Sequence, residues 1–540
     1  MKKSTTLLIL LLTSIIAFSQ NSSFEYIFSD SVNLHQSILF EDIIELSNGD
    51  YVLQGDLYVL DDAMYQRMLC CYFSKDGELK AEKDFPDEEG YKYSPKSILK
   101  EFKDGNLYLV RALNVDNEKQ LRDVHNSKIV INRIDSDLNT TILKEFYIPI
   151  DGTGAIDITS VEEIGNDNFV ICFEKFCHNF GAHPCGQGND TTFFWKIDSN
   201  LDIVKEGFIK HSKCNLDRNS GVCMIYDENN DKYLYYTFFL PNTSYNSGLT
   251  IYNMDSDFNL IGQTTMPQTI GGGSIIPFII NDTRNVSYKR TSRNTTVIGT
   301  SITTMNAQNL ENFTSALCIE VDDDLNLIDS IHKGAVLDTN SAYLTRTPWG
   351  RCIDWVNDNE IFFAYTPHAY SMPMTGNPRK TQKCIITKLN REFNTIKEFS
   401  YGNDSIFLWI NTIKATRDGG CIIAGHFRDI SSGLPYNIGD MQGIVKKIPA
   451  AAFISVEEIS ENSFNTVIAY PNPGNNVLNI KTSLQNASVE VYNILGKVVY
   501  KQDITDISTA IPTGSWNSGI YMWKVYSNGK EAENGKWIKK

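Results

Sequence analysis

Two short motifs recur along the chain, and apolar runs lie on both sides of each. The first is a turn that leads into an apolar run, as in SNGDYVLQG from Ser47, KDGNLYLVR from Lys103 and RDGGCIIAG from Arg417. The second is an Asp-containing turn, as in RIDSDLN from Arg133, KIDSNLD from Lys196, NMDSDFN from Asn253 and EVDDDLN from Glu320. The repeating unit of about sixty residues therefore predicts four antiparallel strands joined by tight turns and one variable loop.

A repeated four-stranded unit is typical of a β-propeller, and the period alone supports it, because WD and kelch signatures are missing. The seventh copy stops at IVKKIP from Ile444 without a fourth strand, while SFEYIFSDS from Ser23 precedes the first copy. We expect Ser23–Ser31 to pair with the strand around Gln442–Lys447, which closes the ring and removes its exposed edges. The sequence predicts an all-β fold with a seven-bladed β-propeller over residues 22–452; six or eight blades are the alternatives.

Long insertions identify the face on which we expect a partner to bind. They begin near Asn114, Cys177, Thr366 and Arg428, and all four fall between the second and third strands of a copy. In a propeller these loops share a face with the connections between blades, whereas the tight turns point the opposite way. Variable loops on a rigid scaffold commonly hold binding sites, so the long-loop face is the predicted functional face.

The last part of the chain has a different character. Residues 453–462 are predicted to form a linker, and residues 463–540 read as short strands separated by turn signals, such as VLNIKT from Val477 and GIYMWKVYS from Gly519. This pattern predicts a small Ig-like β-sandwich.

Four motifs in this segment occur in a characteristic order: YPNPGNNVLNI from Tyr470, VEVYNILGKVVY from Val489, GSWNSGIYMWKV from Gly514 and the terminal KWIKK. Residues 463–540 resemble the type IX secretion C-terminal sorting domain of Bacteroidota; the alternative is an ordinary adhesive sandwich. The resemblance implies passage through the periplasm, translocation across the outer membrane by the type IX machinery, and release or attachment to surface lipopolysaccharide. The motif residues are Pro471, Asn472, Pro473, Gly496, Gly519, Tyr521, Lys539 and Lys540.

The first residues have the pattern of a signal peptide over residues 1–19. Lys2 and Lys3 precede an apolar run, and small residues predict cleavage between Ser19 and Gln20. The alternative is a membrane anchor, but the run is shorter than the roughly 20 apolar residues that span a bilayer. No later stretch is long and apolar enough to span, so we expect a secreted or surface-attached mature chain without a membrane span.

Charge and cysteine content narrow the possible partners. The net charge is −16, so the chain should repel the phosphates of nucleic acid. Eleven cysteines are present, an odd number, so at least one thiol is free unless chains pair. Export permits disulfides, and Cys177–Cys185 and Cys214–Cys223 are the predicted pairs. The cysteines within strand-like runs are expected to be small buried apolar residues: Cys172, Cys318, Cys384 and Cys421.

Candidate metal sites are weak. The alternating Asp and Asn of IDSDLN resemble half of an EF-hand loop, but position 12 counted from Asp135 is Phe146 and not the required Glu. Asp and Asn also suit hairpin turns, so we interpret these motifs as turns, with calcium as the alternative. Cys177, His178, His183 and Cys185 match no standard zinc spacing, and a disulfide-stapled loop is preferred. No cofactor is predicted.

Catalytic motifs such as G-x-S-x-G and H-E-x-x-H are missing from the sequence, which argues against an enzyme. TPWGRCIDW, which begins at Thr347, could place Trp349 and Arg351 in a pocket, although an aromatic-rich strand end is the simpler interpretation. We therefore expect a recognition protein for an extracellular glycan or protein. The alternative is a polysaccharide hydrolase or lyase with its site in the channel mouth, since propellers host both.

Overall fold

The computed structural model contains two compact units, Met1–Phe453 and Ile454–Lys540, which are described separately. Together the described residues contain no helix with the length and apolar character of a membrane span. The structure describes residues 23–28, 36–59, 65–85, 88, 91–93, 97–115, 126–149, 154–165, 168–177, 191–210, 223–239, 248–265, 278–280, 286–305, 312–338, 343–348, 350–370, 383–402, 406–429, 441–453, 468–470, 474–482, 484, 486–494, 496–505, 508–527 and 530–540.

In the described part of the first unit, the strands form seven antiparallel sheets. Sheet one contains β2 (Gln36–Glu45), β3 (Tyr51–Val59), β4 (Tyr65–Phe73) and β5 (Leu79–Phe85). Sheet two contains β6 (Tyr91–Tyr93), β7 (Ile98–Glu101), β8 (Leu107–Val115), β9 (Asn126–Ile134) and β10 (Thr140–Pro149). Sheet three contains β11 (Gly154–Ile164), β12 (Asn168–Cys177), β13 (Thr191–Ile197) and β14 (Ile203–Lys210). Sheet four contains β15 (Cys223–Asp227), β16 (Lys232–Phe239), β17 (Gly248–Asp255) and β18 (Leu260–Thr265). Sheet five contains β19 (Phe278–Ile280), β20 (Ser287–Arg290), β21 (Thr296–Met305), β22 (Asn312–Val321) and β23 (Leu327–Asp338). Sheet six contains β24 (Tyr343–Arg346), β25 (Ile353–Asp354), β26 (Ile361–Tyr370), β27 (Cys384–Leu389) and β28 (Thr395–Tyr401). Sheet seven contains β29 (Ile406–Ala415), β30 (Cys421–Asp429), β31 (Gln442–Ile448) and β1 (Glu25–Ile27).

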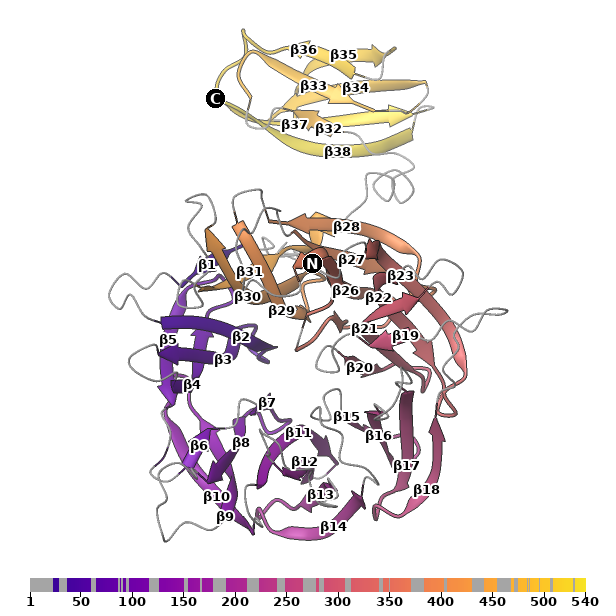
Figure 1. Ribbon diagram of the computed structural model, residues 1–540. Coiled ribbons are helices and arrows are strands. Elements are labelled where there is room, and N and C mark those ends of the chain that lie inside the picture. Colours follow the sequence, from indigo (N-terminus) through magenta and orange to yellow (C-terminus); the bar gives the residue numbers. More distant parts are fainter. Residues whose placement is uncertain are drawn as a thin grey trace, which may run out of the picture. The chain divides into compact units, whose positions relative to one another are not determined.

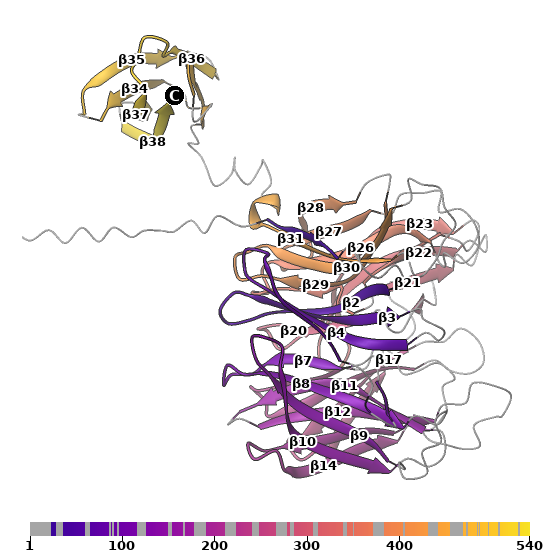
Figure 2. The ribbon, with the colours of Figure 1, turned by 90° about the vertical axis from the view of Figure 1, so that its left-hand side faces the viewer.

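The seven sheets stand side by side in a ring, with the first strand of each sheet innermost and the fourth outermost (Figure 1). The tight turns between first and second strands lie at one end of the ring, on the left in Figure 2. Because consecutive strands are antiparallel, the turns between third and fourth strands lie at the same end. We call this end the tight-turn end.

The chain's first strand completes the last sheet. In β1, Glu25, Tyr26 and Ile27 pair with Lys446, Val445 and Ile444 of β31, which confirms the predicted pairing. The ring of Phe28 lies 4.9 Å from that of Phe40 in sheet one. Sheets one and seven also share a core, whose members include Phe28, Phe40, Phe73, Ile422 and Val445. The two ends of the first unit are therefore joined by both hydrogen bonds and apolar packing.

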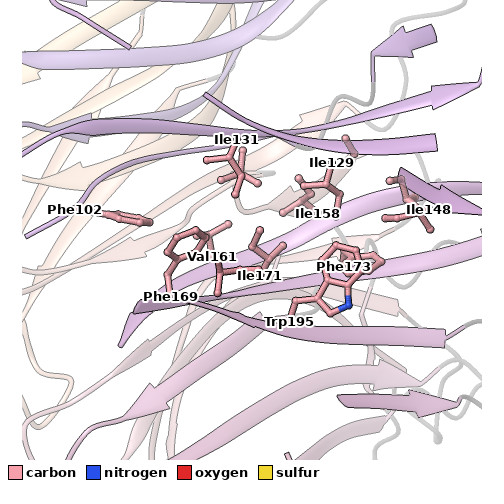
Figure 3. Close-up of a cluster of buried hydrophobic side chains, with 14 residues drawn as sticks. Phe102, Ile129, Ile131, Ile148, Ile158, Val161, Phe169, Ile171, Phe173 and Trp195 are labelled. Carbon is pink, nitrogen blue, oxygen red and sulfur yellow. The ribbon is translucent and has the colours of Figure 1, made fainter. Parts of the chain in front are cut away.

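Each sheet buries both of its faces between two neighbours, which explains why consecutive residues of a second strand such as β12 are apolar. In β12, Ile171 and Phe173 pack toward sheet two, whereas Val170 and Cys172 pack toward sheet four. Figure 3 shows the first of these cores, with Phe102, Ile129, Ile131, Ile148, Ile158, Val161, Phe169, Ile171, Phe173 and Trp195.

The Asp-containing motifs form hairpin turns, as predicted. In the turn after β9, Asp135 Oδ1 accepts the backbone N–H groups of Asp137 at 3.0 Å and Asn139 at 2.7 Å. These N–H groups, that of Asn139 first, lower the pKa of Asp135. The residues described contain no group of three or more side chains that could hold a metal ion. Through its hydrogen bonds to these two N–H groups the carboxylate stabilises the hairpin turn.

An apolar residue in left-handed geometry completes each of these turns. Leu138 has φ of 60° and is fully buried. Left-handed geometry is unfavourable for such a residue, and its burial between sheets offsets the cost. The side chain of Phe258 packs directly against the backbone of Gly207 in the neighbouring sheet. A Cβ added at Gly207 would lie only 2.5 Å from the Phe258 Cβ. The equivalent residues are Leu201, Phe258, Leu325 and Phe393.

The innermost strand is broken in sheets two, five and six, although the repeat predicts one continuous strand. In sheet six, residues 347–352 separate β24 from β25. Pro348 has no N–H group for the ladder, which favours a break there. Beyond it, Gly350 donates its N–H to Asn411 O at 2.7 Å. A Cβ added at Gly350 would lie 2.3 Å from Glu41 O, so this segment is wedged between the inner strands of sheets seven and one.

We predict that Gly350→Ala destabilises the protein by about 1–3 kcal/mol, because the new methyl group must displace backbone on both sides. Urea unfolding followed by fluorescence measures the effect. The matched control is Gly262→Ala in β18, where an added Cβ has open space around it. Equal midpoints for the two variants would contradict the wedge.

The second unit contains two sheets that share one core. They are formed by β32 (Ile468–Tyr470), β33 (Val477–Lys481) and β36 (Ser508–Pro512), and by β35 (Val498–Ile504), β34 (Ala487–Asn493), β37 (Gly519–Ser527) and β38 (Lys530–Lys539). Leu478 and Ile511 of the first sheet pack with Val489, Trp523 and Trp537 of the second. The predicted two-layer arrangement is present, although β32 and β36 were not predicted.

Candidate functional site at the ring axis

One register position on the innermost strands collects charged side chains. In each sheet it is the residue that pairs with Val52 or its equivalent near the start of the second strand. Five of the seven residues at this position are charged. In sheet order they are Ile44, Lys100, Glu162, Ile225, Lys289, Asp354 and Lys414. All lie close before a tight turn, so they surround the axis near the tight-turn end.

Ion pairs at this position join neighbouring sheets. Lys100 Nζ lies 3.2 Å from Glu162 Oε2, which links sheets two and three. Asp354 receives Lys289 on Oδ1 and Lys414 on Oδ2, the latter at 3.0 Å, so one carboxylate links sheets five, six and seven. The N–H of Ala415 also donates to Asp354 Oδ2 at 2.9 Å.

A further ion pair joins sheet six to sheet one, past the innermost strand of sheet seven. The Arg351 guanidinium lies 2.9 Å from Asp42 Oδ1, and its backbone carbonyl accepts the N–H of Ile413 at 3.0 Å. Arg351 thus reaches over β29 from the wedged segment. We define the axial cluster as these four cations and three carboxylates: Asp42, Lys100, Glu162, Lys289, Arg351, Asp354 and Lys414.

Burial and charge oppose each other in the axial cluster. Burial alone would raise the pKa of Asp354, but Lys289, Lys414 and Arg351 outweigh it and hold that pKa well below its usual range. Burial lowers the pKa of Lys289, and the positive charges of Lys414 and Arg351 lower it further, against the pull of Asp354. The cations therefore repel one another across a single buried carboxylate.

Charged side chains from several sheets affect the pKa of the Cys223 thiol. Burial and then Glu162 raise the pKa of this thiol to about 12, whereas Lys100 and Arg351 lower it. Groups from sheets two, three, four and six thus act at one place on the axis. The thiol is free in the structure.

The disulfide predictions fall mostly outside the described residues. Cys185 and Cys214 are not described, nor is the side chain of Cys177, and the free thiol of Cys223 gives no support to its pairing with Cys214. Both pairings stay predictions. The expectation of buried thiols is confirmed for Cys172, Cys318, Cys384 and Cys421.

A second group of side chains lies farther along β29 from the tight-turn end. The guanidinium of Arg346 lies 5.3 Å from the centre of the Trp409 ring, which also stacks on His426. Burial lowers the pKa of His426 to about 3, so this imidazole is neutral near pH 7. The insertions of the predicted functional face lie outside the described residues at 116–125, 178–190, 371–382 and 430–440, and Trp349 is also outside them.

In the second unit, the two ends of the motif set meet. Lys539 is buried, and its ammonium group donates to Asn475 Oδ1 at 3.0 Å, while the Gly474 N–H donates to Ile538 O at 2.9 Å. Lys540 donates its backbone N–H to Gly474 O at 2.9 Å. The terminal lysines thus fasten the strand end to the loop that follows the Pro-Asn-Pro motif, whose Pro471, Asn472 and Pro473 are not described.

The other motif residues have structural roles. Gly496 has φ of 76° in a tight turn, and Gly519 has φ of 151°, so both need backbone geometry that glycine tolerates. Tyr521 donates its hydroxyl to Asn517 O at 2.8 Å and packs on Trp516. The predicted cleavage residues Ser19 and Gln20 lie outside the described residues.

Sequence reasoning missed the axial cluster except for Arg351. The signal was present, since alignment of the copies on their second strands places Lys100, Glu162, Lys289, Asp354 and Lys414 in one column. The recurring turn motifs do not reveal this column, because the charged residues lie in front of the turns.

Comparison with known proteins identifies the second unit. Residues 468–540 match the family model of the secretion system C-terminal sorting domain, which confirms the resemblance. Funoran endo-beta-hydrolase from Wenyingzhuangia aestuarii is 25% identical over 88 residues, which cover 16% of this chain and only 12% of that protein.

Two solved structures are similar to much of the chain at low sequence identity. The β-propeller domain of the Trilobed protease from Pyrococcus furiosus is 9% identical, with 72% of this chain and 90% of that chain covered and a TM-score of 0.36. The alpha-L-arabinanase of Penicillium chrysogenum, solved with arabinobiose, is 8% identical, with 80% and 99% covered and a TM-score of 0.34. Similarity at this level supports no conclusion on function.

Proposed function

Because residues 468–540 form a type IX secretion C-terminal sorting domain, which directs export to the cell surface or the medium, we propose that this chain is an exported recognition protein. Its first unit is a closed seven-bladed β-propeller that binds an extracellular glycan or protein. Its C-terminal domain is an Ig-like sandwich handled by the type IX machinery. Residues 1–19 are the signal peptide, and residues 453–462 are the linker.

The observation that carries the recognition role is the state of the axial carboxylates. Each carboxylate in the axial cluster is ion-paired. The pKa of Asp354 is lowered, as are those of Asp323 and Asp418 outside the cluster. Glycoside hydrolysis commonly needs a carboxylic acid whose pKa is raised so that it can donate a proton. The cluster is therefore better suited to hold a ligand than to cleave one.

A binding screen tests this function. The mature first unit would be applied to glycan and protein arrays and, in parallel, to a panel of polysaccharide substrates. We expect saturable binding without turnover. Turnover that is lost when residues of the axial cluster are replaced by alanine would contradict the recognition role and favour the hydrolase or lyase.

We predict that deletion of residues 463–540 leaves the protein in the periplasm, because the signal peptide still acts and the sorting domain is gone. Cell fractionation and immunoblotting measure the distribution. The control is the full chain with Val204→Ser, a change at an exposed position of the first unit that should leave export intact. Unchanged arrival of the deleted chain outside the cell would contradict the sorting assignment.

A further inference from the structure

The axial cluster carries an excess of positive charge within an acidic protein. Its four cations and three carboxylates have a formal charge of +1, whereas the chain as a whole has −16. Lys289, Lys414 and Arg351 gather around Asp354, and their mutual repulsion is not fully cancelled by that carboxylate. One further negative charge would balance the site.

The cations remain accessible although they are enclosed by protein. The Arg351 and Lys414 side chains retain 27% and 26% of their exposed area, while the Asp354 side chain retains only 2%. The carboxylate is thus buried, while part of each of these two cations stays exposed to a ligand.

These two cations also have donors suited to an anion. Arg351 contacts Asp42 through one nitrogen, and a guanidinium has five N–H donors in a planar fork that matches carboxylate or sulfate. Lys414 contacts Asp354 through one of the three donors of its ammonium group. Backbone contacts on both sides of Arg351 hold it in place, since Gly350 is wedged and Ile413 binds its carbonyl. Such a prearranged donor set can bind an anion without first being reorganised.

We infer that the axial cluster binds the anionic group of an acidic saccharide, a carboxylate or a sulfate, between Arg351 and Lys414. The inference rests on the proposed recognition function and names the ligand class of the same site. Neutral parts of the saccharide extend toward either mouth of the ring. Inorganic anions share this chemistry but lack the sugar ring.

Calorimetric titration of the mature protein with glucuronate, glucose 6-sulfate, glucose and sodium sulfate tests the inference. We expect at least one acidic sugar to bind about tenfold or more tightly than glucose, because a charged hydrogen-bonding pair is added. Lys414→Gln should weaken that binding by a similar factor. Lys144→Gln is the matched control, since it breaks a comparable pair between sheets, with Asp202 at 2.9 Å, on the outer wall. It should leave the affinity unchanged.

Thermal unfolding separates binding from a purely structural role. If the cluster only joins sheets, Lys414→Gln lowers the melting temperature and the acidic sugars do not raise that of the wild type, which would overturn the inference. If neither glucuronate nor glucose 6-sulfate binds more tightly than glucose, the inference is overturned, while the proposed recognition function would stand. Sodium sulfate binding as tightly as either acidic sugar would show an adventitious ion only. Should Lys414→Gln not fold, Arg351→Lys keeps the charge, removes the fork and is expected to weaken binding in the same way.

Discussion

Replacing Asp354 by asparagine is expected to lower the free energy of unfolding by about 3–5 kcal/mol, the usual cost of removing one partner from a buried ion pair. The carboxylate is almost fully buried and holds Lys289 and Lys414 together, and the N–H of Ala415 donates to it. Without its charge, two ammonium groups and Arg351 repel one another at the centre of the ring. Chemical denaturation at pH 7 measures the loss. Asp257→Asn, at an exposed pair with Lys205, is the control and should cost less than about 1 kcal/mol.

The same group makes stability depend on pH. The folded-state pKa of Asp354 is held below the value of about 3.9 expected in the unfolded chain. Its stabilisation is therefore complete above that value and declines as the pH falls further. We expect the difference in stability between wild type and Asp354→Asn to shrink below about pH 4. A difference that stays constant down to pH 2 would show that the carboxylate's charge is not the cause.

The second large effect is expected at the joint between sheets one and seven. Phe28→Ala should cost about 3–5 kcal/mol, because the ring is buried among Phe40, Phe73 and Tyr26. The loss also loosens β1, which pairs with β31 over only three residues. Amide hydrogen exchange should then speed up in β31 before it does so in the other sheets.

Phe208→Ala is the control for this change. Phe208 lies on the outermost strand β14 with its side chain largely exposed, so its removal should change stability by less than about 1 kcal/mol. Similar losses for the two variants would mean that β1 does not close the ring in solution.

Much of the architecture could be predicted because it repeats. A tight turn leaves a strong local signal, and that signal located the strands on either side of it and the unpaired segment around Ser23. The missing fourth strand of the last copy then predicted the partner of β1. The ordered motifs of the C-terminal segment carried the sorting domain in the same way.

Features without a local signal were missed. The break between β24 and β25 depends on the close approach of Gly350 to Glu41, more than 300 residues earlier in the chain. The ion pairs of Asp354 depend on which strands are neighbours around the axis. Leu138 in left-handed geometry contradicts local preference, and only its burial between sheets explains it.

The bond from Ser23 Oγ to Lys447 O joins residues 424 positions apart, and β1 has no other strand to pair with in the described structure. Such distant contacts form late, because a long chain must be confined before they can add stability. A chain cut or stalled before residue 442 would keep an open edge strand and an exposed aromatic core. The first unit can therefore fold completely only when the chain reaches β31. Shorter chains leave exposed the strand edge and apolar surface at which proteolysis and aggregation begin.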